Sequence, residues 1–393
     1  MLQHDSKITD TIPRASVVQI LGTLGHLATV EKSNFEAVRR FLYSQSGRRS
    51  PASSTALWTV ARDVLTELQR LSWAVIGVLP RRRSDIDRLR DSPCEITPAG
   101  KELAAAAATK RGLAFDTLLI AWLESHPYFR GLIVRLAMSP LYVPDITSAA
   151  QVGSSRSVVE ITAHVLQNCE DRLAGVSFGP AKFSVFGEGL RRRMSGASAQ
   201  LASPDLDSKK LVDLIQDSVV IPSLLESEQL PFDGVTFHHL LKIAGEFFAA
   251  ASTTSHPDFG GRIVFSTCDF IPTISLSAST KILAVQHHGG TFARPRFAEA
   301  LATAYAKVAV SSGGYADAYK VRAIVCLELQ IQPPVFALCL KELMSGDETS
   351  GPIIYTELPF TPPPQGEDYV EASQRRIGKL MIKAFPNGVK HGT

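Results

Sequence analysis

Long apolar runs are missing from this 393-residue chain. No stretch of about 18 uninterrupted apolar residues occurs, which is the length that a membrane-spanning helix needs. The first residues, MLQHDSKITDTIPR, are polar and lack the apolar core of a signal peptide. Cysteine is scarce, with five residues and no Cys-x-x-Cys spacing, which disfavours a disulfide framework or a structural zinc site. These absences predict a cytoplasmic protein with no membrane partner.

Two nucleotide-binding signatures are also missing. No Gly-x4-Gly-Lys-Ser/Thr segment occurs, which excludes a P-loop ATPase. No Gly-x-Gly-x-x-Gly segment follows a predicted strand, which disfavours the usual dinucleotide or methyl-donor folds. We therefore expect no cofactor, except Mg²⁺ if the nuclease alternative considered below holds.

Positive charge is concentrated in the first half of the chain. The net charge is only +3, but residues 1–200 hold 25 Lys and Arg against 18 Asp and Glu, and the remainder holds 16 against 20. A polyanionic partner is therefore expected to meet the first half. Chance asymmetry is the alternative.

Residues 15–105 contain three helical patterns followed by two short strands. Apolar spacing, β-branched composition and a Thr97-Pro98 pair at the start of a further helix support this order. The expected elements are helices at 15–29, 35–45 and 55–71, strands at 73–79 and 94–96, and a charged segment at 80–93. The expected caps are Ser33-Asn34, Ser53 or Ser54, and Thr97. The third helix is expected to pack through Leu57, Val60, Ala61, Val64, Leu65 and Leu68, with Trp58, Thr59, Arg62 and Glu67 elsewhere.

The segment CEITPAGKELA, residues 94–104, is similar to the Leu-Thr-Pro-x-Gly-x-x-Leu-Leu junction of MarR- and PadR-like winged-helix proteins. The resemblance implies a winged-helix domain at 13–110. It also implies that the helix at 53–70 reads a DNA groove and that Arg81, Arg82 and Arg83 lie on the wing near phosphates. The alternatives are a solvated charged loop and a winged helix that pairs with proteins.

The same order recurs at 111–197, which predicts a second winged helix. Helices are expected at 114–125 and 128–138, and Ala149, Gly153 and Val159 have helix-turn-helix spacing. Strands are expected at 174–178 and 181–186, and KFSVFGEGLRRRM, residues 182–194, matches CEITPAGKELA as a junction of strand and helix.

Beyond a linker at 196–210, residues 211–393 are predicted to form a C-terminal α/β domain, in which we recognise no family. Helices are expected at 211–225, 236–252, 297–311, 334–344 and 371–385, and strands at 261–270, 272–277, 281–288, 321–331 and 351–358. The fold class is thus mixed α+β and α/β, with two winged helices before a C-terminal α/β domain.

Metal-dependent DNA cleavage is one hypothesis for the C-terminal domain. Weak candidates for the acidic groups of a restriction-type site are Glu246, Asp269 and Glu328. A Glu-x-Lys pair is missing, because Gln330 stands two positions after Glu328. His287 and His288 are adjacent on a predicted strand and so face opposite sides, which disfavours one shared metal.

The first hypothesis is therefore a cytoplasmic protein that binds double-stranded DNA. Its C-terminal domain would bind a protein partner, form a homodimer or sense a ligand, in a regulator or in a recruitment component of DNA processing or genome defence. The alternatives are a metal-dependent DNA nuclease and a winged-helix subunit of a protein assembly. The expected DNA-binding residues are Arg48, Arg49, Ser54, Thr55, Thr59, Arg81, Arg82, Arg83, Ser155, Arg156, Ser157, Arg191, Arg192 and Arg193.

Overall fold

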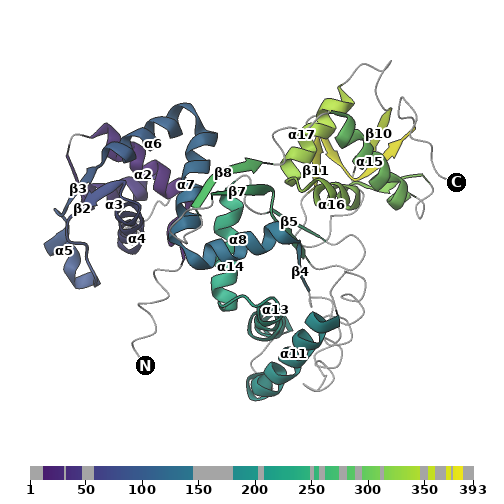
Figure 1. The fold of residues 1–393 in the computed structure, drawn as a ribbon, viewed down its shortest axis with the longest axis horizontal. Helices are drawn as coiled ribbons and strands as arrows, with labels where there is room; N and C mark the ends of the chain where they lie inside the picture. Colours follow the sequence, from purple (N-terminus) through teal and green to yellow (C-terminus); the bar gives the residue numbers. More distant parts are fainter. Residues whose placement is uncertain are drawn as a thin grey trace. The chain divides into compact units, whose positions relative to one another are not determined.

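The computed structural model of the chain is a mixed α+β structure, mainly helical, with small antiparallel sheets (Figure 1). It describes residues 12–30, 32–46, 57–144, 180–201, 208–247, 252–255, 262–273, 281–287, 294–309, 314–345, 353–358, 369–372 and 375–383. Contacts divide the chain into two compact units. The first unit consists of Met1–Leu132, His239–Phe247 and Phe270–Val285, and the second of Ile133–His238, Phe248–Asp269 and Gln286–Thr393. The domain boundaries expected from the sequence stay a prediction.

The first unit begins with helices and a three-stranded antiparallel sheet whose strand order is β1-β3-β2. Its elements are α2 Val17–Thr29, β1 Ser33–Asn34, α3 Phe35–Gln45, α4 Leu57–Arg70, β2 Ala74–Ile76, a 3₁₀ turn at Arg83–Asp85, α5 Ile86–Leu89, β3 Pro93–Ile96 and α6 Pro98–Thr109. The short α5 lies at the end of the β2–β3 hairpin remote from α6 (Figure 1). The helices and strands predicted for this part of the sequence are thus confirmed, apart from a few residues at their ends.

Side-chain caps explain where three of these helices begin. Ser16 and Gln19 form a reciprocal capping box at α2. The Asn34 Oδ1 atom accepts a hydrogen bond from the Ala37 amide at 2.8 Å. At α6 the Thr97 hydroxyl oxygen accepts one from the Gly100 amide at 3.2 Å, and Pro98 follows the cap. The caps predicted at Asn34 and Thr97 are confirmed.

Gly100 allows α6 to begin directly against the backbone of Trp73, the residue that precedes β2. A Cβ atom at this position would lie 2.1 Å from the Trp73 carbonyl oxygen and 2.9 Å from the Ile96 side chain. The Thr97 amide also donates to the Trp73 carbonyl oxygen at 3.0 Å. The glycine of the CEITPAGKELA segment is therefore required by a close backbone approach.

The apolar face of α4 packs largely as predicted, with two differences. Leu57, Ala61, Val64, Leu65 and Leu68 are buried, whereas Val60 is only half-buried. Glu67, which was predicted to lie away from this face, is buried with 3% of its surface exposed. The prediction was wrong because Glu67 follows the fully buried Val64 by three positions, and residues three apart share a helical face.

A cluster of aromatic rings forms the core of the rest of the first unit. The Trp122 ring centroid lies 5.3 Å from that of Phe247 and 6.1 Å from that of Phe129, and Phe115 lies 6.4 Å from Phe247. These rings come from α7 Arg111–Ser125, from the start of α8 Pro127–Met138, and from the residue that follows α14 Gly234–Glu246. Strands β7 Cys268–Thr273 and β8 Lys281–His287 pair with each other. The helices predicted at 114–125 and 128–138 are confirmed.

The strand predicted at 181–186 in the second unit is wrong, because α11 is a helix that spans Pro180–Leu201. Phe186, Leu190 and Met194 are buried at a spacing of four residues, which is a helical period. The helix also covers the start of the predicted linker at 196–210. Ala149, Gly153, Val159 and the strand predicted at 174–178 lie outside the described residues.

Helix α11 packs against α13 Ile221–Ser227 through Gly189, whose missing side chain leaves room for Ser223. The helix predicted at 211–225 is present as α12 Ser208–Ile215, a π-helical segment at Gln216–Val220 and α13. Pro222 has no backbone N–H group to donate the hydrogen bond that a regular helix would make at this position.

A three-stranded antiparallel sheet, in the order β4-β6-β5, consists of β4 Leu141–Val143, β5 Ser252–Ser255 and β6 Arg262–Phe265.

The last part of the second unit combines three helices with two small antiparallel sheets. Strands β10, β13 and β9 form one sheet in that order, and β11 pairs with β12. The elements are α15 Arg294–Ala309, β9 Ala316–Asp317, α16 Ala318–Leu329, α17 Pro333–Met344, β10 Ile354–Glu357, β11 Val370–Ala372, β12 Arg375–Ile377 and β13 Lys379–Ile382.

Two predictions in this part were wrong. The strand predicted at 321–331 is the helix α16, in which Val321, Val325 and Leu329 are buried one turn apart. Within the helix predicted at 371–385, the described residues 371–372, 375–377 and 379–382 form strands, and Leu380 and Ile382 alternate there with less buried residues. The helices predicted at 297–311 and 334–344 and the strand at 351–358 are confirmed within a few residues.

Candidate nucleic-acid interface

The hairpin between β2 and β3 has an ordered basic tip. Its tip contains the 3₁₀ turn and α5, so this segment is folded where the sequence indicated only a charged excursion. Arg81, Arg82 and Arg83 are all exposed. Within the part of the chain that the structure describes, none of their guanidinium groups is paired with a carboxylate. We call Arg81–Arg83 the arginine run.

Asp85 orders the backbone of the arginine run. Its Oδ2 atom accepts hydrogen bonds from the amides of Arg81 and Arg82, at 3.2 and 3.0 Å. Its Oδ1 atom lies 3.9 Å from a guanidinium nitrogen of Arg88. A carboxylate thus holds the turn through its main chain and leaves the arginine side chains exposed.

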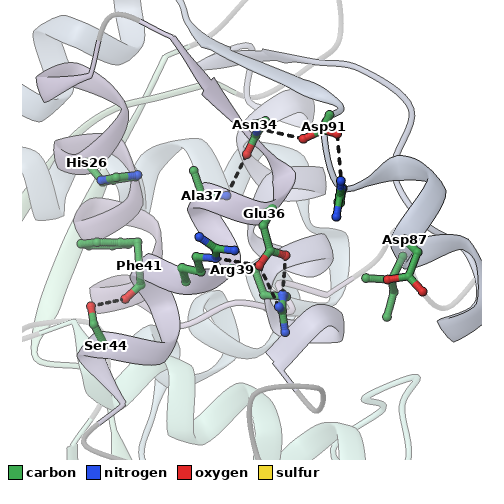
Figure 2. A pocket seen from close by; sticks show the side chains of 12 residues that line it. His26, Asn34, Glu36, Ala37, Arg39, Phe41, Ser44, Asp87 and Asp91 are labelled. Atoms are coloured by element: carbon green, nitrogen blue, oxygen red, sulfur yellow. Dashed lines mark hydrogen bonds and ion pairs between the residues drawn. The ribbon is translucent and has the colours of Figure 1, made fainter. Parts of the chain in front are cut away.

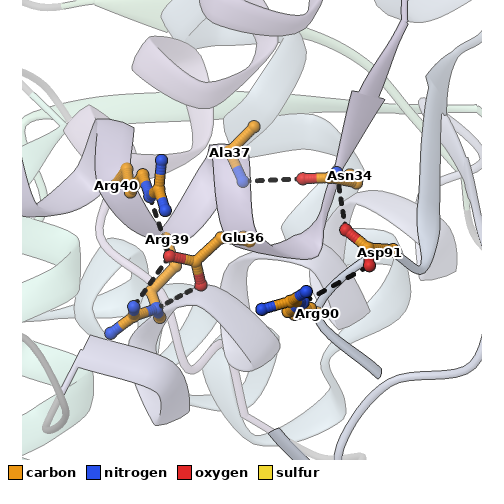
Figure 3. Close-up of polar contacts among 7 residues, drawn as sticks. All are labelled: Asn34, Glu36, Ala37, Arg39, Arg40, Arg90 and Asp91. Atoms are coloured by element: carbon orange, nitrogen blue, oxygen red, sulfur yellow. Dashed lines mark hydrogen bonds and ion pairs between the residues drawn. The ribbon is translucent and has the colours of Figure 1, made fainter. Parts of the chain in front are cut away.

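The returning side of the hairpin tip is fixed to the start of α3 (Figure 3). The amides of Phe35 and Glu36 donate to the carbonyl oxygens of Ser92 and Arg90, both at 2.9 Å. The side chains of Asn34 and Asp91 also meet at 3.5 Å. Amides in the first turn of a helix have no partner within the helix, so the hairpin tip satisfies groups that would otherwise need water.

A hollow of about 830 Å³ lies between α3 and α5 (Figure 2). Its lining consists of His26, Asn34, Glu36, Ala37, Arg39, Arg40, Phe41, Ser44, Ile86, Asp87, Arg90 and Asp91. Three arginines and three carboxylates therefore line it, so their formal charges cancel. This balance distinguishes the hollow from the neighbouring arginine run, and it makes the hollow a poor site for a polyanion.

Glu36 is the centre of the charge pairs in the hollow (Figure 3). Arg39 donates to both oxygens of Glu36 at 2.9 Å, and the Arg40 Nε atom donates to Oε1 at 2.8 Å. The bond from Arg39 is the main cause that holds the pKa of Glu36 below its usual range. The same pairing raises the pKa of Arg39.

His26 lies in the lining of the hollow and stacks on Phe41, with ring centroids 4.6 Å apart. Its Nε2 atom is buried and makes no hydrogen bond among the described residues. Burial lowers the pKa of His26, because the charged imidazolium loses its hydration there.

The outer face of α4 carries a neutralised arginine. The Arg62 guanidinium lies over the Trp58 ring, 5.1 Å from its centroid, and 2.9 Å from an Asp63 oxygen. Thr59 is half-buried. The predicted DNA-binding residues Arg48, Arg49, Ser54, Thr55, Ser155, Arg156 and Ser157 lie outside the described residues.

Sequence reasoning missed a buried polar cluster behind α4. The Glu67 Oε1 atom lies 2.5 Å from His126 Nε2, and the Arg70 Nη1 atom lies 3.3 Å from His126 Nδ1. Glu67 and Arg70 belong to α4, and His126 directly follows α7. The three-residue spacing from Val64 to Glu67 was a signal in the sequence, and nothing there identified His126 as the partner.

The second predicted basic cluster, Arg191–Arg193, lies on α11. Arg192 and Arg193 both contact Glu226 on α13, at 2.7 and 2.6 Å. Hydrogen bonds from Arg192 and then Arg193 lower the pKa of Glu226. Arg191 is exposed. Two of the three guanidinium groups thus share one carboxylate, which compensates one of their two positive charges.

The candidate acidic groups of the nuclease hypothesis belong to three different elements. The Glu246 carboxylate accepts a hydrogen bond from the Val17 amide at 2.7 Å, at the start of α2. Glu328 is exposed on α16, and Asp269 lies on β7. Among the described residues, no group of three or more His, Cys, Asp or Glu side chains is arranged to hold a metal ion.

Comparison with protein-family models, with curated proteins and with solved structures found no match for this chain. No single helix in the described ranges has the length and apolar character needed to cross a bilayer.

Proposed function

We propose that this chain is a double-stranded DNA-binding protein whose residues 13–110 form a winged-helix domain. In this proposal α4 enters the major groove, and the β2–β3 hairpin is the wing that contacts phosphates. The element order α2, β1, α3, α4, β2, β3 and the sheet order β1-β3-β2 support the proposal. So does the resemblance of residues 94–104 to winged-helix junctions.

The observation that carries the proposal is the arginine run. Three exposed guanidinium groups lie together at a hairpin tip without a carboxylate partner among the described residues. On the neighbouring helices α3 and α4, by contrast, arginines are paired: Arg39 and Arg40 with Glu36, and Arg62 with Asp63. Uncompensated cations on an ordered turn are suited to bind DNA phosphates, which carry most of the affinity in such complexes.

Fluorescence anisotropy with a labelled duplex of about 30 base pairs tests the proposal. We expect binding by the wild type that weakens steeply from about 50 to 200 mM salt. The triple variant Arg81→Ala, Arg82→Ala, Arg83→Ala should weaken binding by about tenfold or more and reduce the salt slope by up to about 3. A salt-independent interaction, or no interaction, would contradict DNA binding and leave the protein-docking alternative.

A matched control removes the same charge elsewhere. Arg375, Arg376 and Lys383 are exposed in the β11–β13 region. Their triple alanine variant has the same net charge as the arginine-run variant, so it should reproduce any effect of total charge alone. If both triple variants lose equal affinity, the binding is not located at the wing.

The proposal does not include a second winged helix, because the expected ribbon strand at 181–186 is helical. A role of the C-terminal residues in dimerisation, partner binding or sensing stays a prediction.

The nuclease alternative gains no support from Glu246, whose carboxylate accepts a hydrogen bond from the Val17 amide. Incubation of the wild type with duplex DNA and Mg²⁺ or Mn²⁺ tests that alternative directly.

A further inference from the structure

The hairpin tip carries three acidic residues, Asp85, Asp87 and Asp91, beside the arginine run. Carboxylates on a phosphate-binding surface weaken binding by like-charge repulsion. Removing any of them is therefore expected, from charge alone, to strengthen binding. Their contacts differ, however, and this difference separates Asp85 from the other two.

Asp85 is the acidic residue that is bonded to the arginine run itself. Its side chain is 27% exposed, and its Oδ2 atom accepts from two successive backbone amides of the run, those of Arg81 and Arg82. The backbone of Arg82 is extended, with φ −127° and ψ 159°, and the 3₁₀ turn starts at the next residue. The chain thus changes direction within the run, at the point that Asp85 holds.

Asp87 and Asp91 have other surroundings. Asp87 is exposed, and its carboxylate accepts no hydrogen bond among the described residues. Its negative charge contributes through space to the raised pKa of Arg39. It stands apart from the paired charges of the hollow (Figure 2). Asp91 contacts Asn34 and Arg90 on the returning side of the tip.

We propose that Asp85 is a positioning residue for DNA binding, which fixes the turn from which the guanidinium groups of the arginine run reach phosphates. The inference rests on the proposed function. Fixing a loop before binding reduces the conformational entropy lost on binding, and this gain opposes the repulsion of the carboxylate. Asp85 should therefore favour binding in spite of its charge.

Duplex anisotropy on the full chain separates positioning from charge, because the two effects have opposite signs. Asp85→Ala should weaken binding by about fivefold, since the turn loses its acceptor. Asp85→Asn keeps an acceptor oxygen and should remain within about twofold of the wild type. The matched control Asp87→Ala removes the same charge without a hydrogen bond and should strengthen binding by about twofold.

If Asp85→Ala strengthens binding as Asp87→Ala does, the positioning role is overturned while the proposed function stands. Failure of the wild type to bind any duplex overturns the proposed function. Hydrogen exchange of the Arg81 and Arg82 amides then tests whether Asp85 orders the turn in the free protein. Faster exchange in Asp85→Ala, but not in Asp87→Ala, supports the ordering of the turn, and unchanged exchange overturns it.

Discussion

The Glu67 carboxylate and the His126 ring form a hydrogen bond of 2.5 Å between two side chains that are almost fully excluded from solvent. Arg70 approaches the other ring nitrogen, Nδ1, at 3.3 Å. A guanidinium group can only donate hydrogen bonds, so the Nδ1 atom of His126 accepts one from Arg70. The Nε2 atom therefore carries the ring hydrogen and donates a hydrogen bond to the Glu67 carboxylate. A buried polar network thus joins the proposed DNA-reading helix α4 to the end of α7.

Loss of Glu67 should destabilise the protein strongly. Glu67→Ala leaves the buried His126 imidazole without its hydrogen-bond acceptor, which is expected to cost about 3 kcal/mol of unfolding free energy. Glu67→Gln keeps an acceptor and should cost less. Urea denaturation measures both. The exposed Glu95, on β3, provides the control: Glu95→Ala should change stability by less than about 0.5 kcal/mol. Equal effects of Glu67→Ala and Glu95→Ala would show that the pair contributes nothing.

Substitution at Gly100 should distort the junction between β3 and α6. The added Cβ would lie 2.1 Å from the Trp73 carbonyl oxygen, so backbone must move, and we expect Gly100→Ala to cost about 2–4 kcal/mol. Gly112, on α7, serves as the matched control, because a methyl group added there would have no neighbouring atom within 4 Å outside its own helical turn. Gly112→Ala should be neutral or stabilise by up to about 1 kcal/mol, because alanine favours the helix. Thermal unfolding of the two variants distinguishes them.

Stability should depend on pH through His26. Burial lowers the pKa of His26 below its ordinary value of 6.5, so between the folded pKa and 6.5 the unfolded chain binds more protons. The unfolding free energy should therefore fall as the pH decreases below 6.5. His26→Phe keeps a ring on Phe41 and removes the titration, so it should lose less stability than the wild type between about pH 7.5 and 5.5. Parallel pH profiles for the two proteins would contradict this expectation.

The Arg192–Arg193 pair should matter less for DNA than the arginine run. Both guanidinium groups are already held by the Glu226 carboxylate, at 2.7 and 2.6 Å, and it compensates one of their two charges. We expect the double variant Arg192→Ala, Arg193→Ala to change duplex affinity by less than about threefold, and stability by less than about 1 kcal/mol, as for exposed ion pairs. Anisotropy and urea denaturation check the two effects. A loss of affinity as large as that of the arginine-run variant would place α11 in the interface.

The first hundred residues could be predicted from the sequence because their signals are local. Asn34 and Thr97 have short side chains that reach an amide three residues ahead, and the bounds of α3 coincide with the predicted 35–45. Residues 321–331 could not be predicted from composition, since β-branched residues favoured a strand. Val321, Val325 and Leu329 do recur at the four-residue spacing of a buried helical face, but the β-branched composition was given more weight in the prediction.

The candidate site was predicted in part. The arginine run is visible as three consecutive charges in the sequence. The acceptor role of Asp85 depends on the path of the turn, and the pairing of Arg192 with Glu226 joins residues far apart in the chain. Such pairings arise only when tertiary structure brings the partners together, so single-residue patterns do not reveal them.

Phe247 completes the aromatic core around Trp122, and the carboxylate of its neighbour Glu246 accepts a hydrogen bond from the Val17 amide. The first unit therefore cannot close its core during synthesis until residue 247 has left the ribosome. Until then the Trp122 ring lacks one of its partners, and the nascent chain presents an apolar surface to which chaperones bind. For the same reason, a truncation that ends after α6 or α7 would be expected to aggregate, even though it contains the whole proposed winged helix.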